Sequence, residues 1–486
     1  MLYKGRKIQC RAYQNISDKI IKLIKFQKSS EREIQEIFTT MQNNKYLYWI
    51  TFVAINGGLL FGLNMAGISG AVDMIKGEFS LTDSGLGTVA ALLTIGCLVG
   101  ALFTGNFTEK FGRKKVMIFT SLLYIVSALG CAFAESSSVL IIFRVLSGLA
   151  VGATSVVGPM YISEISPAKN RGKLVSFNQF AITIGIVLAY VFDYLLIGLG
   201  EQSWRYMLAV PAVFGAVYFL FLILKFPESP RWLIANGRRD DAIQVLNSIG
   251  GKLLVEQELP EMESVLKAEQ KKEKMSFGEL FRGKTGKIVL IGTLIAAFQQ
   301  ITGINAVIMF APDIFQAAGS AKGDSMMQAM IVGLVNFLMT IVALGLVDKK
   351  GRKTLLLWGA VGMILSLAYL TFEFARPVQN GVGVLVALLV YISFFAASFA
   401  PVMWVIISEI YPNRIKGLAM SFSTAVSWLC TFLTVYFAPV IQGSLGLHYL
   451  FAIFGVFSII AFIFVKIWIP ETKGKSLEQI ERELGV

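Results

Sequence analysis

The chain has 486 residues, 55% of them hydrophobic and 15% charged, with a formal net charge of +13 and a mean hydropathy of +0.66. This composition is too apolar for a soluble chain of this length and indicates a membrane protein. The single histidine and four cysteines have no catalytic or metal-binding spacing, so no enzyme signature, metal site or cofactor is expected.

The first 40 residues carry nine Lys or Arg against four acids. Four lysines between 19 and 28 recur every three residues among apolar side chains, which is typical of a basic helix lying on an anionic membrane surface. Met41 offers a second interpretation, because the chain from Met41 onward reads as a complete start and the preceding residues would then be an upstream mis-start. Residues 1–44 are therefore treated as a separate basic extension.

Apolar windows of about 20 residues, the length that a bilayer core requires at ~1.5 Å per residue, recur along the remaining chain. They predict an all-α membrane protein with twelve transmembrane helices in two six-helix halves, 45–228 and 287–470. The polar stretch 229–286 is expected to form a helical linker domain, and 471–486 a C-terminal tail. The predicted spans are 47–69, 85–106, 115–134, 139–160, 174–197, 205–226, 287–310, 327–347, 354–374, 382–407, 418–440 and 448–469.

Basic side chains mark one set of loops. The loops after predicted helices 2, 4, 8 and 10 read EKFGRKK, SPAKNRGK, DKKGRK and PNRIKG, whereas the opposite loops are poor in basic residues. Because Lys and Arg in short loops stay in the cytoplasm, we expect both termini and the linker to be cytoplasmic. The expected location is the plasma or inner membrane.

The two halves repeat the same motifs. FTEKFGRKK at 107–115 returns as LVDKKGRKT at 346–354, and YISEISPAKNRGKLVSF at 161–177 returns as IISEIYPNRIKGLAMSF at 406–422. Such a duplication is typical of transporters whose halves rock around a central site. The repeated charges are expected to clamp the halves together at the cytoplasmic mouth when the site opens outward, and to separate when it opens inward; alternatively, they serve only as topology and capping charges. These candidate gate residues are Glu109, Arg113, Glu164, Arg171, Asp348, Arg352, Glu409 and Lys416.

A set of segments spread over the chain carries a family resemblance. They are GRK at 112–114 and 351–353, RVLSGLAVG at 144–152, PMYISEISPAKNRG at 159–172, PESPRWL at 227–233, QQITGIN at 299–305, PVMWVIISEIYP at 401–412 and PETKGKSLEQIE at 470–481. Through them the chain resembles the sugar porter family of the major facilitator superfamily. The resemblance implies transport of a small neutral sugar, or of a polyol such as inositol, across a lipid bilayer by alternating access. No nucleic-acid partner is expected.

A neutral polyhydroxylated solute requires uncharged donors and acceptors together with aromatic faces for its C–H surfaces. The predicted spans supply both, and Gly303 can break the helix that carries Gln299 and Gln300, which frees backbone groups. An alternative holds for each position, because amides also bridge helices and Trp also packs or anchors at the interface. By resemblance, the residues that match the family's sugar pocket are Gln179, Gln299, Gln300, Asn305, Asn336, Trp404 and Trp428.

Some pocket positions depart from the family pattern. Met309 and Phe310 stand where the family generally has two tyrosines, and Ser427 replaces an amide. The changes at 309 and 427 remove two candidate hydrogen bonds to the solute. Because buried polar contacts decide discrimination, a preference for glucose does not follow from the resemblance.

Asn64 concerns whether transport is coupled to a proton gradient. In proton-coupled relatives the matching position is usually an aspartate paired with an arginine like Arg144, so that protonation is linked to the conformational switch. A carboxamide cannot titrate, and 206–221 in helix 6 contains no acid, so facilitated uniport is favoured over proton symport. Asp193, at a depth similar to that of Arg144, either neutralises Arg144 or has taken over proton coupling; otherwise it is a hydrated residue at the interface.

Two further classes of function are less favoured. A sugar sensor with this fold usually needs a long cytoplasmic tail, and only a short segment follows Pro470. A drug or organic-ion exporter is expected to show intramembrane charge or a wide apolar cavity in place of the amide cluster.

Overall fold

The computed structural model describes residues 45–167, 171–224, 226–270, 277–411 and 415–473. All regular elements in these ranges are helical, and twelve helices in them are long and apolar enough to cross a membrane. The expected all-α, twelve-span architecture is therefore confirmed. The basic extension before residue 45 lies outside the described residues.

The first half contains six spanning helices, a short helix α2 after the first of them and a 3-10 turn η1. The first spanning helix is Lys45–Ala66. The others, with the short elements, are α2 (Val72–Glu78), α3 (Asp83–Phe111), α4 (Arg113–Ala132), α5 (Ser137–Ile165), α6 (Arg171–Leu196), η1 (Ile197–Leu199) and α7 (Ser203–Ile223).

The second half has the same number of spans, but its first and fourth spans are each divided in two. Its elements are α10 (Gly283–Ile301), α11 (Ile304–Met309), α12 (Ala311–Ala317), α13 (Lys322–Lys350), α14 (Arg352–Ala375), α15 (Gly381–Ala397), α16 (Phe399–Ile410), α17 (Lys416–Ser444) and α18 (Leu447–Trp468). Three elements connect the halves in sequence: α8 (Pro230–Ala235), α9 (Arg239–Gln270) and η2 (Phe277–Phe281).

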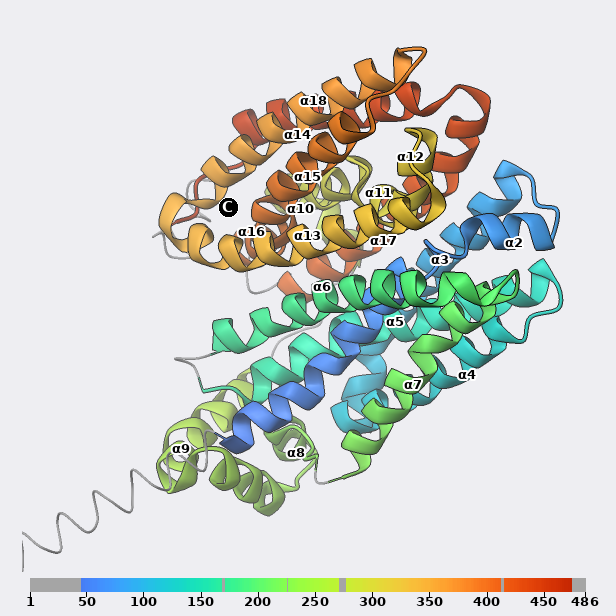
Figure 1. Ribbon diagram of the computed structural model, residues 1–486. Helices are drawn as coiled ribbons and strands as arrows, with labels where there is room; N and C mark the ends of the chain where they lie inside the picture. Colours follow the sequence, from blue (N-terminus) through green and yellow to red (C-terminus); the bar gives the residue numbers. More distant parts are fainter. Residues whose placement is uncertain (1–44, 168–170, 225, 271–276, 412–414, 474–486) are drawn as a thin grey trace, which may run out of the picture.

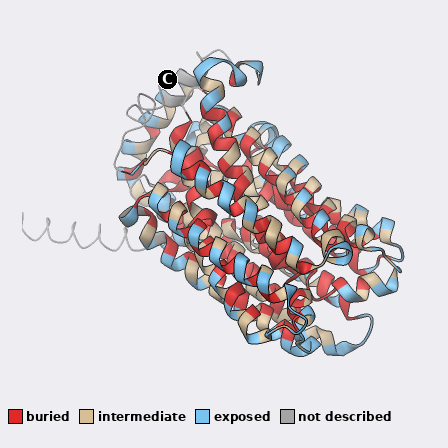
Figure 2. Ribbon diagram, turned by 90° about the horizontal axis from the view of Figure 1, so that it is seen from above, coloured by how far each residue is buried: buried red, intermediate tan, exposed pale blue. Residues whose placement is uncertain are grey.

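Figure 1 shows the two halves as adjacent bundles, the first in blue to green and the second in yellow to red. They meet where α3 packs along α17 and α6 packs along α13. The elements α8 and α9 lie against one end of the first half (Figure 1). Buried residues concentrate inside each bundle, and exposed residues lie mainly on the outer faces (Figure 2).

The repeated Gly-Arg turns have the same geometry in both halves. Gly112 separates α3 from α4 at φ 94°, and Gly351 separates α13 from α14 at φ 88°, a backbone region that favours glycine. A Cβ atom at either position would collide with a carboxylate, that of Glu228 or that of Glu471. We call the end of the molecule that carries these turns the Gly-Arg end, and the other the opposite end.

Candidate functional site

Three predicted sugar ligands form a continuous chain of hydrogen bonds. The Asn305 Nδ2 donates to Gln300 Oε1 at 2.6 Å, and Gln300 Nε2 donates to Gln299 Oε1 at 2.9 Å. Gln299 Nε2 then donates to the main-chain oxygens of Phe399 and Ala400 at 3.1 and 3.2 Å. We call Asn305, Gln300 and Gln299 the amide relay.

Two broken helices position the amide relay. Gly303, at φ 98°, ends α10 and begins α11, so it places Asn305 beside the Gln299–Gln300 pair. The second break is at Ser398, between α15 and α16, and the acceptors of Gln299 follow it directly. Gln299 is buried, whereas Gln300 and Asn305 are half-buried. The amide relay therefore links the two breaks and leaves two of its members partly accessible.

The other four predicted ligands lie outside the amide relay. Gln179 in α6 is half-buried and Asn336 in α13 is buried, and neither side chain has a hydrogen bond to another described residue. Trp428 in α17 is buried and packs on Phe61 of the first helix, with ring centroids 5.7 Å apart, so this contact crosses between the halves. Trp404 in α16 is 40% exposed. Their role in sugar binding stays a prediction.

Asn64 and Arg144 contact each other, but only through a main-chain carbonyl. The Asn64 amide is used within the first half: its Oδ1 accepts from Ser147 Oγ at 2.6 Å, and its Nδ2 donates to the Leu60 oxygen at 2.8 Å. The Arg144 guanidinium donates to the main-chain oxygens of residue 64 at 3.3 Å and of Val89 and Ala90 at 3.5 Å. The described residues place no carboxylate within 4.0 Å of Arg144.

The expected pairing of Asp193 with Arg144 is absent. Asp193 Oδ2 instead accepts hydrogen bonds from Ser69 Oγ at 3.1 Å and from the Gly70 main-chain N–H at 2.9 Å, in the turn that follows the first helix. The residue is only 1% exposed, so the interpretation of a hydrated interfacial residue is also wrong. No ion pair to Asp193 is formed by any described residue.

At the Gly-Arg end, each half holds its own charged cluster. Arg113 pairs with Glu164 at 2.7 Å, and the Glu228 carboxylate accepts from the main-chain N–H groups of Arg113, Lys114 and Ser229. Burial raises the pKa of Glu228, although these N–H groups and the Arg113 charge oppose the rise. The second half repeats this arrangement with Arg352, Glu409 at 3.0 Å and Glu471.

The arginine and the carboxylate come from the same half in both pairs, so the clamp between the halves, which was expected for the outward-open state, stays a prediction. Arg171 is exposed and approaches Glu258 of α9 at 4.0 Å, and Glu109 is exposed. Lys416 is half-buried and contributes no ion pair to a described residue, and the Asp348 side chain lies outside what the structure describes. In this conformation the repeated pairs therefore join helices within each half.

A model of the family described as "Sugar (and other) transporter" matches residues 50–484. The chain belongs to the sugar porter family of the major facilitator superfamily. A D-xylose-proton symporter of Escherichia coli is 35% identical over 480 residues, which cover 91% of this chain and 96% of that protein. The glucose transporter GlcP of Staphylococcus epidermidis is 36% identical over 447 residues, covering 91% and 98%. The inward-open structure of the xylose transporter XylE from E. coli has a TM-score of 0.80 at 32% identity and covers 90% and 100%.

In this sugar porter, hydrogen bonds between the halves lie at the opposite end. Tyr190 of α6 donates to the Ile308 main-chain oxygen of α11 at 2.6 Å. The hydroxyls of Ser84 in α3 and Tyr436 in α17 lie 2.9 Å apart. These contacts, with the packing of α3 on α17, join the two halves at the opposite end.

Sequence reasoning missed these tyrosines and gave no role to Glu228 and Glu471. A signal for the two glutamates was present, because FPESPRWL and IPETKGKSL place a glutamate at equivalent positions of the two halves. The tyrosines carried no comparable signal, since a membrane-embedded tyrosine is ordinary at a helix end.

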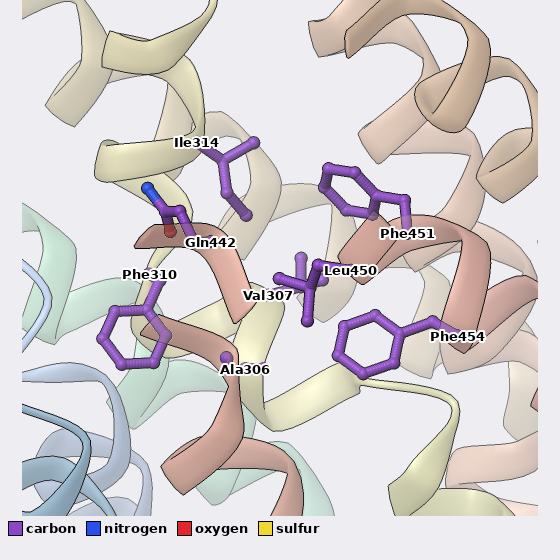
Figure 3. Close-up of a pocket in the computed structure, with 9 residues that line it drawn as sticks. Ala306, Val307, Phe310, Ile314, Gln442, Leu450, Phe451 and Phe454 are labelled. Carbon is purple, nitrogen blue, oxygen red and sulfur yellow. The ribbon is translucent and has the colours of Figure 1, made fainter. Parts of the chain in front are cut away.

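A small cavity behind α11 is not a second sugar site. Figure 3 shows Phe310 on one side and Phe454 on the other, with Val307 between them. Its lining is apolar apart from Gln442. A polyhydroxylated solute would find too few hydrogen-bond partners there, so the amide relay remains the better candidate.

Proposed function

We propose that this sugar porter carries a neutral monosaccharide or polyol between its two halves by alternating access, with the amide relay at the centre of the binding site. The amide relay is the observation that supports this proposal most directly. Its bonds join only uncharged amides and main-chain carbonyls, so sugar hydroxyls can replace them without leaving a charge unpaired. The xylose and glucose transport named for the two relatives supports this class of substrate.

The conformation fits one step of such a cycle. Tyr190 and Tyr436 hold the opposite end closed, and the likeness to an inward-open relative supports access from the Gly-Arg end. The basic loops favour a cytoplasmic Gly-Arg end, in a plasma or inner membrane. We therefore propose that sugar leaves to, or enters from, the cytoplasm in the conformation described.

Facilitated uniport is the favoured mode of transport. Asn64 cannot bind or release a proton, and its side chain is already satisfied by Ser147 and Leu60. Arg144 is held by main-chain carbonyls, whose charge does not change with pH. Neither group at this position can thus link a proton to the switch between conformations.

One observation favours proton symport as a second candidate. Asp193 is a carboxyl group inside the first half, with two hydrogen-bond donors and no cation in contact among the described residues. Ionisable groups in such places are functional candidates by default. The E. coli relative is named a proton symporter.

Counterflow tests transport itself. Purified protein in liposomes preloaded with an unlabelled hexose, pentose or inositol should take up the labelled form of its own substrate, and the same solute should raise the melting temperature. A sensor would bind and be stabilised but would not exchange. Failure of every sugar and polyol to exchange would refute the proposed function.

A proton gradient tests the mode of transport. We expect labelled sugar to equilibrate without accumulating when the outside is made acidic, in wild type and in Asp193→Asn alike. Asp324→Asn, at an exposed aspartate of α13, is the matched control. Accumulation that disappears in Asp193→Asn and persists in Asp324→Asn would establish symport through Asp193 instead.

A further inference from the structure

Polar side chains of the two halves meet at the opposite end, where the short helices α2 and α12 both lie (Figure 1). Gln316 of α12 donates from its Nε2 to Asp73 Oδ2 of α2 at 3.4 Å, so this hydrogen bond crosses between the halves. Lys76, one turn further along α2, pairs with Asp83 of α3 at 2.6 Å. The Asp83 carboxylate lies so close to Gly443 of α17 that a Cβ atom there would collide with it. Acidic groups of the first half therefore face the second half directly.

Asp313 adds a carboxyl group of the second half to this contact. It lies three residues before Gln316, on the same face of α12, and is half-buried. The charged groups that act on it are Asp73 and Lys76 of α2 and Lys322 at the start of α13. The elements α11 and α15, which also pack against α12, contain no acidic or basic residue. No described residue forms an ion pair with Asp313.

These surroundings favour a proton on Asp313 while the halves are joined. The residue lies outside the membrane-spanning segments. Burial, and after it the negative charge of Asp73, raise the pKa of Asp313 well above its ordinary value, and the charges of Lys76 and Lys322 oppose the rise. When the halves separate at this end, both carboxyl groups gain water and move apart, so the pKa of Asp313 should return toward its ordinary value.

We propose that Asp313 is a proton-sensitive contact that controls when the halves separate at the opposite end. With a proton bound, it faces Asp73 as a neutral group and the halves stay joined. Without the proton, two negative charges face each other across a partly buried interface, which favours separation. The advantage of the joined conformation is complete below the ordinary pKa of a carboxyl group and is lost as the pH rises through the raised pKa of Asp313.

This contact rests on the alternating access proposed above, and it differs from proton symport. The proton binds and leaves on the same side of the membrane, so the pH on that side changes the rate of transport without any proton crossing. With the Gly-Arg end in the cytoplasm, that side is the cell exterior. A mildly acidic exterior would then keep the halves joined at the opposite end and slow the exchange of sugar with the outside.

Distances between spin labels test the contact in the purified full chain. Labels at Leu199 of the first half and Val378 of the second, both exposed, should give mainly the shorter distance at pH 5. At pH 8 a longer distance should appear, with a ratio of separated to joined molecules about tenfold higher. Asp313→Asn keeps the shape of the protonated group, so it should stay joined at both pH values.

Further variants separate Asp313 from other titrating groups at this end. Asp324→Asn, at an exposed aspartate of α13, and His448→Gln, at the start of α18, should respond to pH as wild type does. Asp73→Asn removes the facing charge, so its response should move to lower pH. The proposal is overturned if Asp313→Asn responds as wild type does, if His448→Gln loses the response, or if wild type gives the same distances at both pH values.

Counterflow of labelled sugar on the same samples distinguishes this proposal from the transport function. If sugar exchanges but the distances do not respond to pH, the contact is refuted and transport stands. If the distances respond but no sugar or polyol exchanges, the proposed function fails and the proton-sensitive contact stands.

Discussion

Gln300 occupies the middle of the amide relay and uses both ends of its amide. Its oxygen accepts from Asn305 and its nitrogen donates to Gln299. In the proposed site, a sugar would exchange its own hydroxyls for these bonds, so the bound and empty sites would each satisfy the same polar groups. Such exchange keeps the net cost of opening the relay small.

Replacing Gln300 with leucine should weaken sugar binding at least tenfold. The change removes one donor and one acceptor for the sugar, and each sugar hydroxyl left unpaired in the occupied site costs about 1 to 3 kcal/mol. Titration calorimetry with the best substrate measures the loss.

The matched control for this prediction is Gln442→Leu, at the amide that lines the apolar cavity in Figure 3. It should bind sugar as wild type does. Equal affinity of the Gln300 variant and wild type would remove Gln300 from the sugar site.

Single residues also show where sequence reasoning stops. Gln299, Gln300 and Asn305 were predictable as a group because a glycine two residues before Asn305 can turn the helix. The pairing of Asp193 with Arg144 was wrong because equal depth along two helices does not say which faces meet. The turn after the first helix occupies the Asp193 carboxylate instead.

Among the elements, the divided helices contain main-chain carbonyls that lack their usual helical N–H donor. Pro312, four residues after Ile308, has no N–H, so the Ile308 oxygen lacks its usual helical donor and accepts from Tyr190 instead. Thr302, at the break between α10 and α11, accepts in the same way from Tyr391 of α15 at 2.9 Å.

The spans themselves were predictable to within a few residues, because bilayer thickness fixes their length. The break at Ser398 was not predicted, although Pro401 follows it and disfavours a continuous helix there. The sequence does not say which residues form hydrogen bonds with the backbone groups freed at such a break, because those residues come from elements far away in the sequence.

At the scale of the whole molecule, ion pairs at the Gly-Arg end join helices within each half. Arg113 with Glu164, and Arg352 with Glu409, join helices of one half only. The sequence repeat correctly indicated equivalent clusters, but it contains no information about which conformation the halves adopt or about contacts between them. A half that is held together in this way can move as a unit, which is what rocking requires.

The balance between conformations then depends on the few bonds that do cross between the halves, and Tyr190→Phe tests this directly. Loss of the Tyr190 hydroxyl removes a hydrogen bond of about 1 kcal/mol that exists only while the opposite end is closed, so the open population should rise about fivefold. Spin labels at Leu199 of the first half and Val378 of the second, both exposed residues at the opposite end, report that population as a distribution of the distance between the labels. Tyr194→Phe, one turn further along α6 and 37% exposed, should leave the distribution unchanged. If both variants gave the wild-type distribution, closure would depend on the packing of α3 against α17 and not on the Tyr190 bond.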